Sequence, residues 1–144
     1  MIVRQILSRK SIEGVETIAP SETVSEAARR LSERRIGALI VSGDGARVDG
    51  ILSERDIVRE LGRRGPACLT DRVEDLMTRD VSACDLGDKA EQVLSKMTGG
   101  RFRHMPVVED GRLIGVISIG DVVEARLSEV VVEKNALEDM IRGF

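Results

Sequence analysis

The sequence predicts an α+β fold built from two tandem copies of one β-α-β-β-α unit. The first observation is a repeated heptad: residues 50–56 (GILSERD) return as residues 115–121 (GVISIGD), 65 positions later. The second is that the flanking segments repeat too, with matching helical stripes and matching turns. Such self-similarity indicates a repeat architecture. We therefore expect a sandwich-like molecule whose halves are related by a pseudo-two-fold axis and packed through their sheets.

Each copy is predicted to begin with a short strand and an amphipathic helix. The strands are residues 15–18, which end before Pro20, and residues 81–84. Thr23 with Glu26, and Asp88 with Glu91, have the spacing of a helix capping box. Apolar residues then recur at helical 3-4-7 spacing. These are Val24, Ala27, Ala28 and Leu31 in the first copy, and Ala90, Val93, Leu94 and Met97 in the second.

A hairpin and a second helix are predicted to complete each copy. Residues 38–41 and 105–108 are almost wholly apolar, as buried strands are, and residues 48–52 and 113–117 are the returning strands. The turns between them, 43–45 and 109–111, both contain Asp-Gly, a pair that favours tight reversals. Ser53 and Ser118 then begin the closing helices.

The repeats set the predicted domain boundaries. The first copy spans residues 1–63 with a lead-in helix at 3–9, a connector spans 64–72, and the second copy spans 73–144 with a helical lead-in at 73–77. The last helix, about residues 121–141, carries more apolar positions than packing on its own sheet requires. We therefore expect a homodimer formed partly through this helix.

Composition excludes several classes of function. The net charge of −3 and the scarcity of aromatic residues (two Phe, no Tyr, no Trp) argue against nucleic-acid binding. One His and two scattered Cys offer neither a metal site nor a nucleophile with a base, so we expect no catalytic residue, no metal and no required cofactor. Free thiols, no apolar signal core and no run of 18 apolar residues predict a cytoplasmic protein without membrane attachment.

The tandem units, each carrying Gly-apolar-apolar-Ser-x-x-Asp, resemble a pair of cystathionine-β-synthase (CBS) domains, known as a Bateman module, over about residues 3–128. Residues 101–108 (RFRHMPVV) are similar to the basic segment and second strand of that family, as found in small stand-alone bacterial members. The resemblance implies clefts between the repeats that bind adenine nucleotides or related adenosyl ligands, and it implies dimers.

Ligand contacts follow from the resemblance residue by residue. In the family, the carboxylates matching Asp56 and Asp121 accept hydrogen bonds from ribose hydroxyls, and the hydroxyls matching Ser53 and Ser118 contact phosphate. Basic side chains at Arg101, Arg103 and His104 reach phosphates, Thr17 lies against the adenine, and Met105 supplies an aliphatic wall. Gly120 permits close backbone approach.

The residues alone leave other interpretations open. Ser-x-x-Asp at a helix start is also a plain cap, the basic segment is also a solvated strand entrance, and a structural hydrogen bond is an equal role for His104. In our alignment the first copy has Gly37-Ala38 where the second has His104-Met105, so the two clefts need not bind the same ligand.

The function predicted from the sequence is a stand-alone regulatory module that senses energy or redox state. It binds AMP, ADP, ATP or NAD(H), catalyses nothing, and acts on a regulated protein that the sequence does not identify. The alternative is a ligand-free dimerisation or interaction module.

Overall fold

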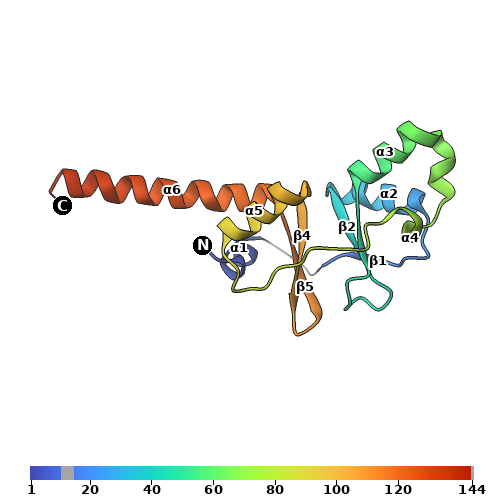
Figure 1. Cartoon of the computed structure of the whole chain (residues 1–144), viewed down its shortest axis with the longest axis horizontal. Coiled ribbons are helices and arrows are strands. Elements are labelled where there is room, and N and C mark those ends of the chain that lie inside the picture. The colour runs from blue at the N-terminus through green and yellow to red at the C-terminus, as the bar shows by residue number, and fades with distance from the viewer. Residues whose placement is uncertain (11–14, 144) are drawn as a thin grey trace.

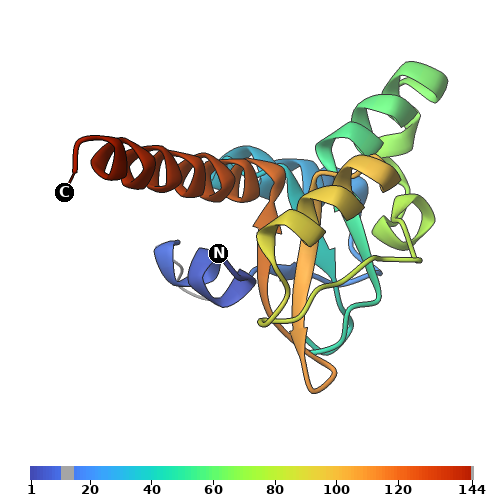
Figure 2. The same ribbon diagram turned by 60° about the vertical axis from the view of Figure 1, so that its left-hand side comes forward.

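The computed structural model of the protein describes residues 1–10 and 15–143 and shows two α+β halves side by side (Figures 1 and 2). The predicted fold class is therefore confirmed. In chain order the elements are α1 (Val3–Arg9), β1 (Thr17–Ile18), α2 (Val24–Arg34), β2 (Ala38–Val41), β3 (Gly50–Ser53), α3 (Glu54–Arg64), a 3₁₀ segment η1 (Gly65–Thr70), α4 (Val73–Leu76), α5 (Ala90–Gly100), β4 (His104–Glu109), β5 (Arg112–Ser118) and α6 (Ile119–Ile141).

The first half is a three-stranded sheet covered by helices. Strand β2 lies between β1, to which it is parallel, and β3, to which it is antiparallel. Helix α2 begins as its sequence predicts, because the Thr23 side chain accepts a hydrogen bond from the Glu26 amide. Its apolar stripe buries Val24 and Leu31 in one core with residues of the sheet and of α3.

The second half contains one antiparallel hairpin, β4–β5, with an irregularity between Val107 and Val108. The predicted strand at residues 81–84 is reduced to a single parallel bridge between Cys84 and Val107. Only Cys84 of that segment is buried, whereas Ser82 and Ala83 are exposed. Most of the segment therefore gains nothing from lying against the sheet, and it runs along the junction between the halves instead.

The two lead-in helices are exchanged between the halves. Helix α1, which precedes the first copy, packs on the second half, where Val3 and Ile6 join its core. Helix α4, which precedes the second copy, packs on the first half through Val73. The boundaries drawn from sequence order stay a prediction, but the packing crosses them in both directions.

Two local expectations differ from the structure. Helix α5 is capped at Lys89 rather than Asp88, because the Asp88 carboxylate accepts a hydrogen bond from the Asp85 amide at 2.9 Å and closes the preceding turn. The start of the expected connector, residues 64–70, is helical, since α3 continues to Arg64 and η1 follows directly.

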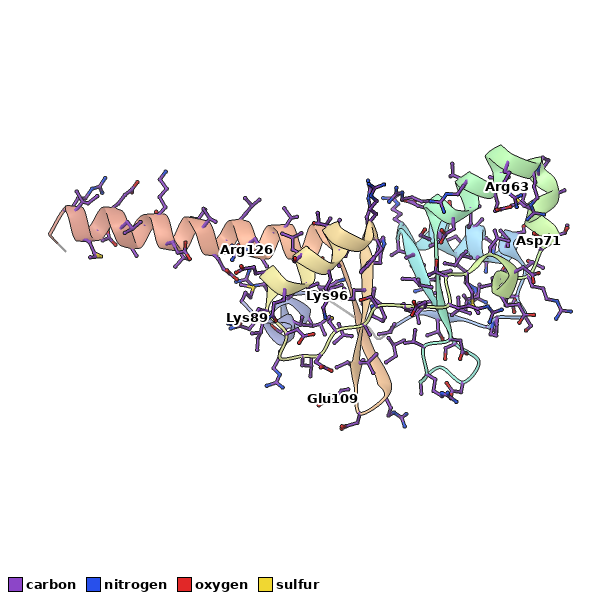
Figure 3. The ribbon with its side chains drawn as sticks, in the orientation of Figure 1. Arg63, Asp71, Lys89, Lys96, Glu109 and Arg126 are labelled. Atoms are coloured by element: carbon purple, nitrogen blue, oxygen red, sulfur yellow. The ribbon has the colours of Figure 1, made fainter. Side chains whose placement is uncertain are left out.

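Helix α6 leaves the body of the molecule after its first turns. Its buried residues are Val122 and Ala125, and the amino terminus of Met1 forms an ion pair with Glu129. Beyond the region of Arg126 the helix projects away from both halves (Figures 1 and 3). The projecting part exposes a series of large apolar side chains: Leu127, Val130, Val131, Val132, Leu137, Met140 and Ile141.

Candidate functional site

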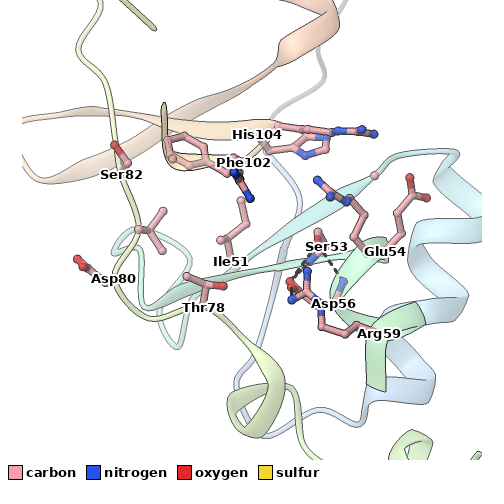
Figure 4. Close-up of a pocket in the computed structure, with 16 residues that line it drawn as sticks. Ile51, Ser53, Glu54, Asp56, Arg59, Thr78, Asp80, Ser82, Phe102 and His104 are labelled. Atoms are coloured by element: carbon pink, nitrogen blue, oxygen red, sulfur yellow. Dashed lines mark hydrogen bonds and ion pairs between the residues drawn. The ribbon is translucent and has the colours of Figure 1, made fainter. Parts of the chain in front are cut away.

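A cavity of about 390 Å³ lies at the junction of the two halves (Figure 4). This volume is within the range of roughly 300–1,000 Å³ that is typical of small-molecule sites. One wall is the start of α3, a second is the chain between α4 and α5, and the third is the segment from Gly100 to His104 that leads into β4. The lining residues are Gly37, Ile51, Ser53, Glu54, Arg55, Asp56, Arg59, Thr78, Asp80, Val81, Ser82, Gly100, Arg101, Phe102, Arg103 and His104.

The first wall is fixed by a capping box at the start of α3. The Ser53 hydroxyl accepts a hydrogen bond from the Asp56 amide at 3.2 Å. In return, Asp56 Oδ2 accepts bonds from the Ser53 amide at 2.9 Å and from the Ser53 hydroxyl at 3.0 Å. Arg59 approaches Asp56 Oδ1 at 3.7 Å from one turn further along the helix. A rigid carboxylate and the positive end of a helix therefore face the same cavity.

The second wall is held to the first by backbone pairing. The Ile51 amide donates to the Thr78 carbonyl at 3.0 Å, and the Thr78 amide donates to the Ile51 carbonyl at 2.9 Å. Figure 4 shows Thr78, Asp80 and Ser82 along this stretch of chain, across from Phe102. The pairing keeps the wall at a defined distance from Ser53 and Asp56.

The third wall brings basic residues of the second half toward the first. Helix α5 ends at Gly100, and the next residue, Arg101, has a left-handed conformation with φ of 58°, so the chain reverses toward β4. Arg101 and Arg103 both line the cavity. Among the described residues, neither makes an ion pair, so both guanidinium groups are available to an anion.

His104 joins the two halves at the edge of the cavity. Its ring lies beside Gly37 of the first half, where an added Cβ would be 3.0 Å from Cε1. Burial lowers the pKa of His104, and the positive charges of Lys10 and Arg103 lower it further, against the opposing effect of Glu54 and Asp121. The imidazole is therefore neutral near pH 7 and offers one donor and one acceptor.

Strand pairing relates the halves residue by residue. Ala38 lies opposite Ser53, and His104 lies opposite Ser118. The carbonyl of Gly37 accepts a hydrogen bond from the first amide of α3. In the same way, the carbonyl of Arg103 accepts a hydrogen bond from the first amide of α6. His104 thus corresponds to Ala38, and Arg103 to Gly37. Our sequence alignment of Gly37-Ala38 with His104-Met105 is wrong by one residue.

The pseudo-equivalent position at the start of α6 has the same cap but a different neighbour. Asp121 Oδ2 accepts from the Ser118 amide at 2.8 Å, and the Asp121 amide donates to the Ser118 hydroxyl at 3.2 Å. Lys10 Nζ lies 2.7 Å from the same carboxylate oxygen. Burial would raise the pKa of Asp121, but the hydrogen bonds from Lys10 and Ser118 and the Lys10 charge together lower it.

The cavity brings together five of the ten residues singled out from the sequence: Ser53, Asp56, Arg101, Arg103 and His104. Ser118, Gly120 and Asp121 lie at the start of α6, and Thr17 lies in β1 beside β2, so these four do not line it. Met105 is fully buried in the core of the second half. Side chains alternate along a strand, so His104 and Met105 point to opposite faces of β4.

Sequence reasoning did not single out several lining residues. Arg59 follows Asp56 by three positions, which places both on one helix face, and this spacing was a usable signal. The wall formed by Thr78, Asp80 and Ser82 gave no comparable signal, because the segment was interpreted as the approach to a strand. Its role depends on pairing with Ile51, 27 residues earlier.

Across residues 1–10 and 15–143, no group of three or more His, Cys, Asp or Glu is placed to hold a metal ion. In that same part of the chain, no helix combines the length and apolar character needed to cross a bilayer.

Comparison with known proteins identifies the repeat. The family model of the CBS domain matches the chain twice, over residues 3–63 and 73–128. The chain belongs to the CBS-domain family. Its two halves are thus two CBS repeats, and the cavity lies between them.

Solved structures support the same assignment. A CBS-domain containing protein from Agrobacterium tumefaciens is 45% identical, with a TM-score of 0.82 over 88% of this chain and 99% of that chain. The protein CBSX2, solved in complex with AMP, is 26% identical, with a TM-score of 0.70 over 88% and 96% of the two chains. The CBS domain pair of protein MJ0100, solved with 5′-methylthioadenosine and S-adenosyl-L-methionine, is 25% identical, with a TM-score of 0.74 over 90% and 98%.

Proposed function

We propose that this protein is a regulatory module that binds an adenine nucleotide in the cavity between its CBS repeats. The observation that carries the proposal is the meeting of Asp56 from one repeat with Arg101 and Arg103 from the other in one cavity of about 390 Å³. Related CBS pairs solved with AMP and with adenosyl compounds support the choice of ligand class.

Each wall has a part in the proposed complex. The Asp56 carboxylate accepts hydrogen bonds from the two vicinal ribose hydroxyls, since it is a strong acceptor with free lone pairs. The amides at the start of α3 and the guanidinium groups of Arg101 and Arg103 bind the phosphate. Phosphate groups bind well at helix N-termini and in bidentate contacts with arginine. The base lies among the backbone and aliphatic groups near Ile51 and Val81, which line the cavity.

The arginines favour phosphorylated ligands within this class. AMP, ADP, ATP and NAD(H) each present at least one phosphate to Arg101 and Arg103, whereas 5′-methylthioadenosine has none. For AMP, about 23 heavy atoms at about 0.3 kcal/mol each give about 7 kcal/mol. The corresponding Kd is on the order of 10 μM.

A thermal-shift panel tests the proposal. At a ligand concentration of about 100 times Kd, binding stabilises the fold by about 2.7 kcal/mol, which raises the Tm by about 5–10 °C. We expect this increase with AMP, ADP, ATP or NADH and a smaller one with 5′-methylthioadenosine. The dye must be extrinsic because the chain has no Trp or Tyr. A panel in which no adenine ligand moves the Tm contradicts the proposal.

Calorimetry with an Asp56→Ala variant locates the site. Losing a hydrogen bond to a charged group costs about 1.5–3 kcal/mol, so the affinity for AMP falls roughly 10- to 150-fold. Asp139→Ala is the matched control, because Asp139 is exposed near the end of α6. Equal affinities for the Asp56 variant and the control would remove Asp56 from the site.

A regulatory role requires that the ligand favour one of two arrangements of the protein. The proposed readout is a change at the junction of the repeats, sensed by a regulated protein. The two free, buried cysteines are consistent with the reducing cytoplasmic setting that the sequence predicts. No turnover of the bound nucleotide is expected, and chromatography after incubation tests this.

The alternative, an assembly module, is favoured by one observation. The projecting part of α6 exposes large apolar side chains, with Leu127 61% and Ile141 86% exposed. We propose that a second copy of the chain covers this face, whether or not a ligand is bound. Light scattering at micromolar concentration tests the homodimer, and a monomeric mass contradicts it. If the protein is a dimer and no adenine ligand changes its Tm, the results would favour an assembly module that binds no ligand.

A further inference from the structure

The two pseudo-equivalent sites differ in what already occupies their carboxylates. Lys10 Nζ donates to Asp121 Oδ2 at 2.7 Å and to the Val116 carbonyl at 2.9 Å. Both ionic groups are largely screened from solvent, with side-chain exposures of 30% for Lys10 and 22% for Asp121. The carboxylate that corresponds to Asp56 is therefore already bound to a cation of the chain itself.

Lys10 is held in place by the packing of the helix that precedes it. Helix α1 is anchored to the second repeat by backbone bonds, in which the Val3 amide donates to Asp88 and the Arg4 amide donates to Leu86, both at 2.9 Å. Val3 is completely buried in that repeat. The Lys10 amide closes the helix end with a bond to the Leu7 carbonyl at 3.1 Å. The ammonium group therefore approaches Asp121 from a fixed backbone.

Among the described residues, no cation is bound as closely to Asp56. Arg59 approaches Asp56 Oδ1 only at 3.7 Å, and its side chain is 68% exposed, so it moves aside at little cost. Three basic side chains, those of Arg55, Arg59 and Arg103, line the cavity on the Asp56 side. By the strand and helix register, the corresponding positions at the other site are Gly120, Glu124 and Gly37. Arg101 has a counterpart in Arg35 at the end of α2, and Glu54 and Asp80 also line the Asp56 cavity. The two sites therefore differ in positive charge by Arg55, Arg59 and Arg103.

We propose that Lys10 keeps the Asp121 site closed, so that each chain binds one nucleotide, at Asp56. This inference takes the identity of the ligand from the function proposed above. A ribose that approaches Asp121 must displace the ammonium from its two acceptors. Breaking a hydrogen bond to a charged group costs enough to lower the affinity of the Asp121 site for the nucleotide roughly 10- to 150-fold.

Titration calorimetry with AMP on Lys10→Met tests the proposal. Lys96→Met is the matched control, because Lys96 is an exposed lysine on α5 (Figure 3) and its loss changes the net charge equally. We expect one AMP per chain for the wild type and for the control, and two for Lys10→Met. Adding Asp121→Asn to Lys10→Met should return the number to one.

Several outcomes overturn the proposal. These are two AMP per chain in the wild type, no added site in Lys10→Met, or an added site that survives Asp121→Asn. If the wild type binds none, the function proposed for the Asp56 cavity fails. In that case an Asp121-dependent site gained by Lys10→Met still supports closure, and no gain overturns it. Circular dichroism checks each variant, and Lys10→Ala repeats the test if the Met variant does not fold.

Discussion

Replacing Gly50 by Ala is predicted to damage both the stability of the protein and the proposed nucleotide site. An added Cβ would lie 2.6 Å from Met77 Sδ and 2.8 Å from the Thr78 carbonyl oxygen. The sulfur can move with its side chain, but the carbonyl belongs to the wall that pairs with Ile51 through two backbone hydrogen bonds. Overpacking costs about 1–3 kcal/mol and each weakened hydrogen bond about 0.5–1.5 kcal/mol. With two such bonds, we expect a total loss of about 2–6 kcal/mol.

The second repeat supplies a matched control for this substitution. At the equivalent Gly115, an added Cβ meets only side-chain carbons of Leu7, the nearest at 2.9 Å. Because a leucine side chain can rotate away, Gly115→Ala should cost at most about 1 kcal/mol. Urea denaturation followed by far-ultraviolet circular dichroism measures both variants, and calorimetry measures their affinity for AMP. Equal stability of the two variants, or unchanged AMP affinity in Gly50→Ala, would refute the reasoning.

Two further predictions concern titration and reactivity. Because burial depresses the pKa of His104 in the folded state, the unfolded chain binds more protons just below pH 6.5, so the free energy of unfolding should fall as the pH drops through that range. Denaturation at pH 7.5 and 5.5 checks this, and an undiminished pH dependence in His104→Gln would exclude His104 as the cause. Burial raises the pKa of Cys84 to about 12, and Cys68 is also buried, so neither thiol should react with a disulfide reagent until the protein unfolds. A thiol that is modified at once in the native protein would contradict the packing described for it.

The local elements were predictable because each depends on neighbours in sequence. Strand β2 occupies the four residues expected for it, and the caps at Thr23, Ser53 and Ser118 form as their spacing predicts. The cap expected at Asp88 failed because its carboxylate had an equally near partner in the turn before it. Several polar partners within a few residues cannot be ranked from spacing alone.

The features that the sequence did not reveal depend on contacts between distant residues. Lys10 meets Asp121 across 111 positions, and α1 packs on the repeat that it does not precede. Nothing in the periodicity of either segment specifies such partners. The placement of Met105 was predictable in principle, because alternation along a strand forbids both it and His104 from facing one cavity.

We expect one nucleotide to bind both repeats across the cavity. An AMP titration followed by backbone amide signals in two-dimensional NMR tests it most directly. The amide signals of Ser53 and Asp56 should shift together with those of Arg101 and His104, at one shared Kd. Signals that shift on only one of these two segments, or on neither, would contradict it.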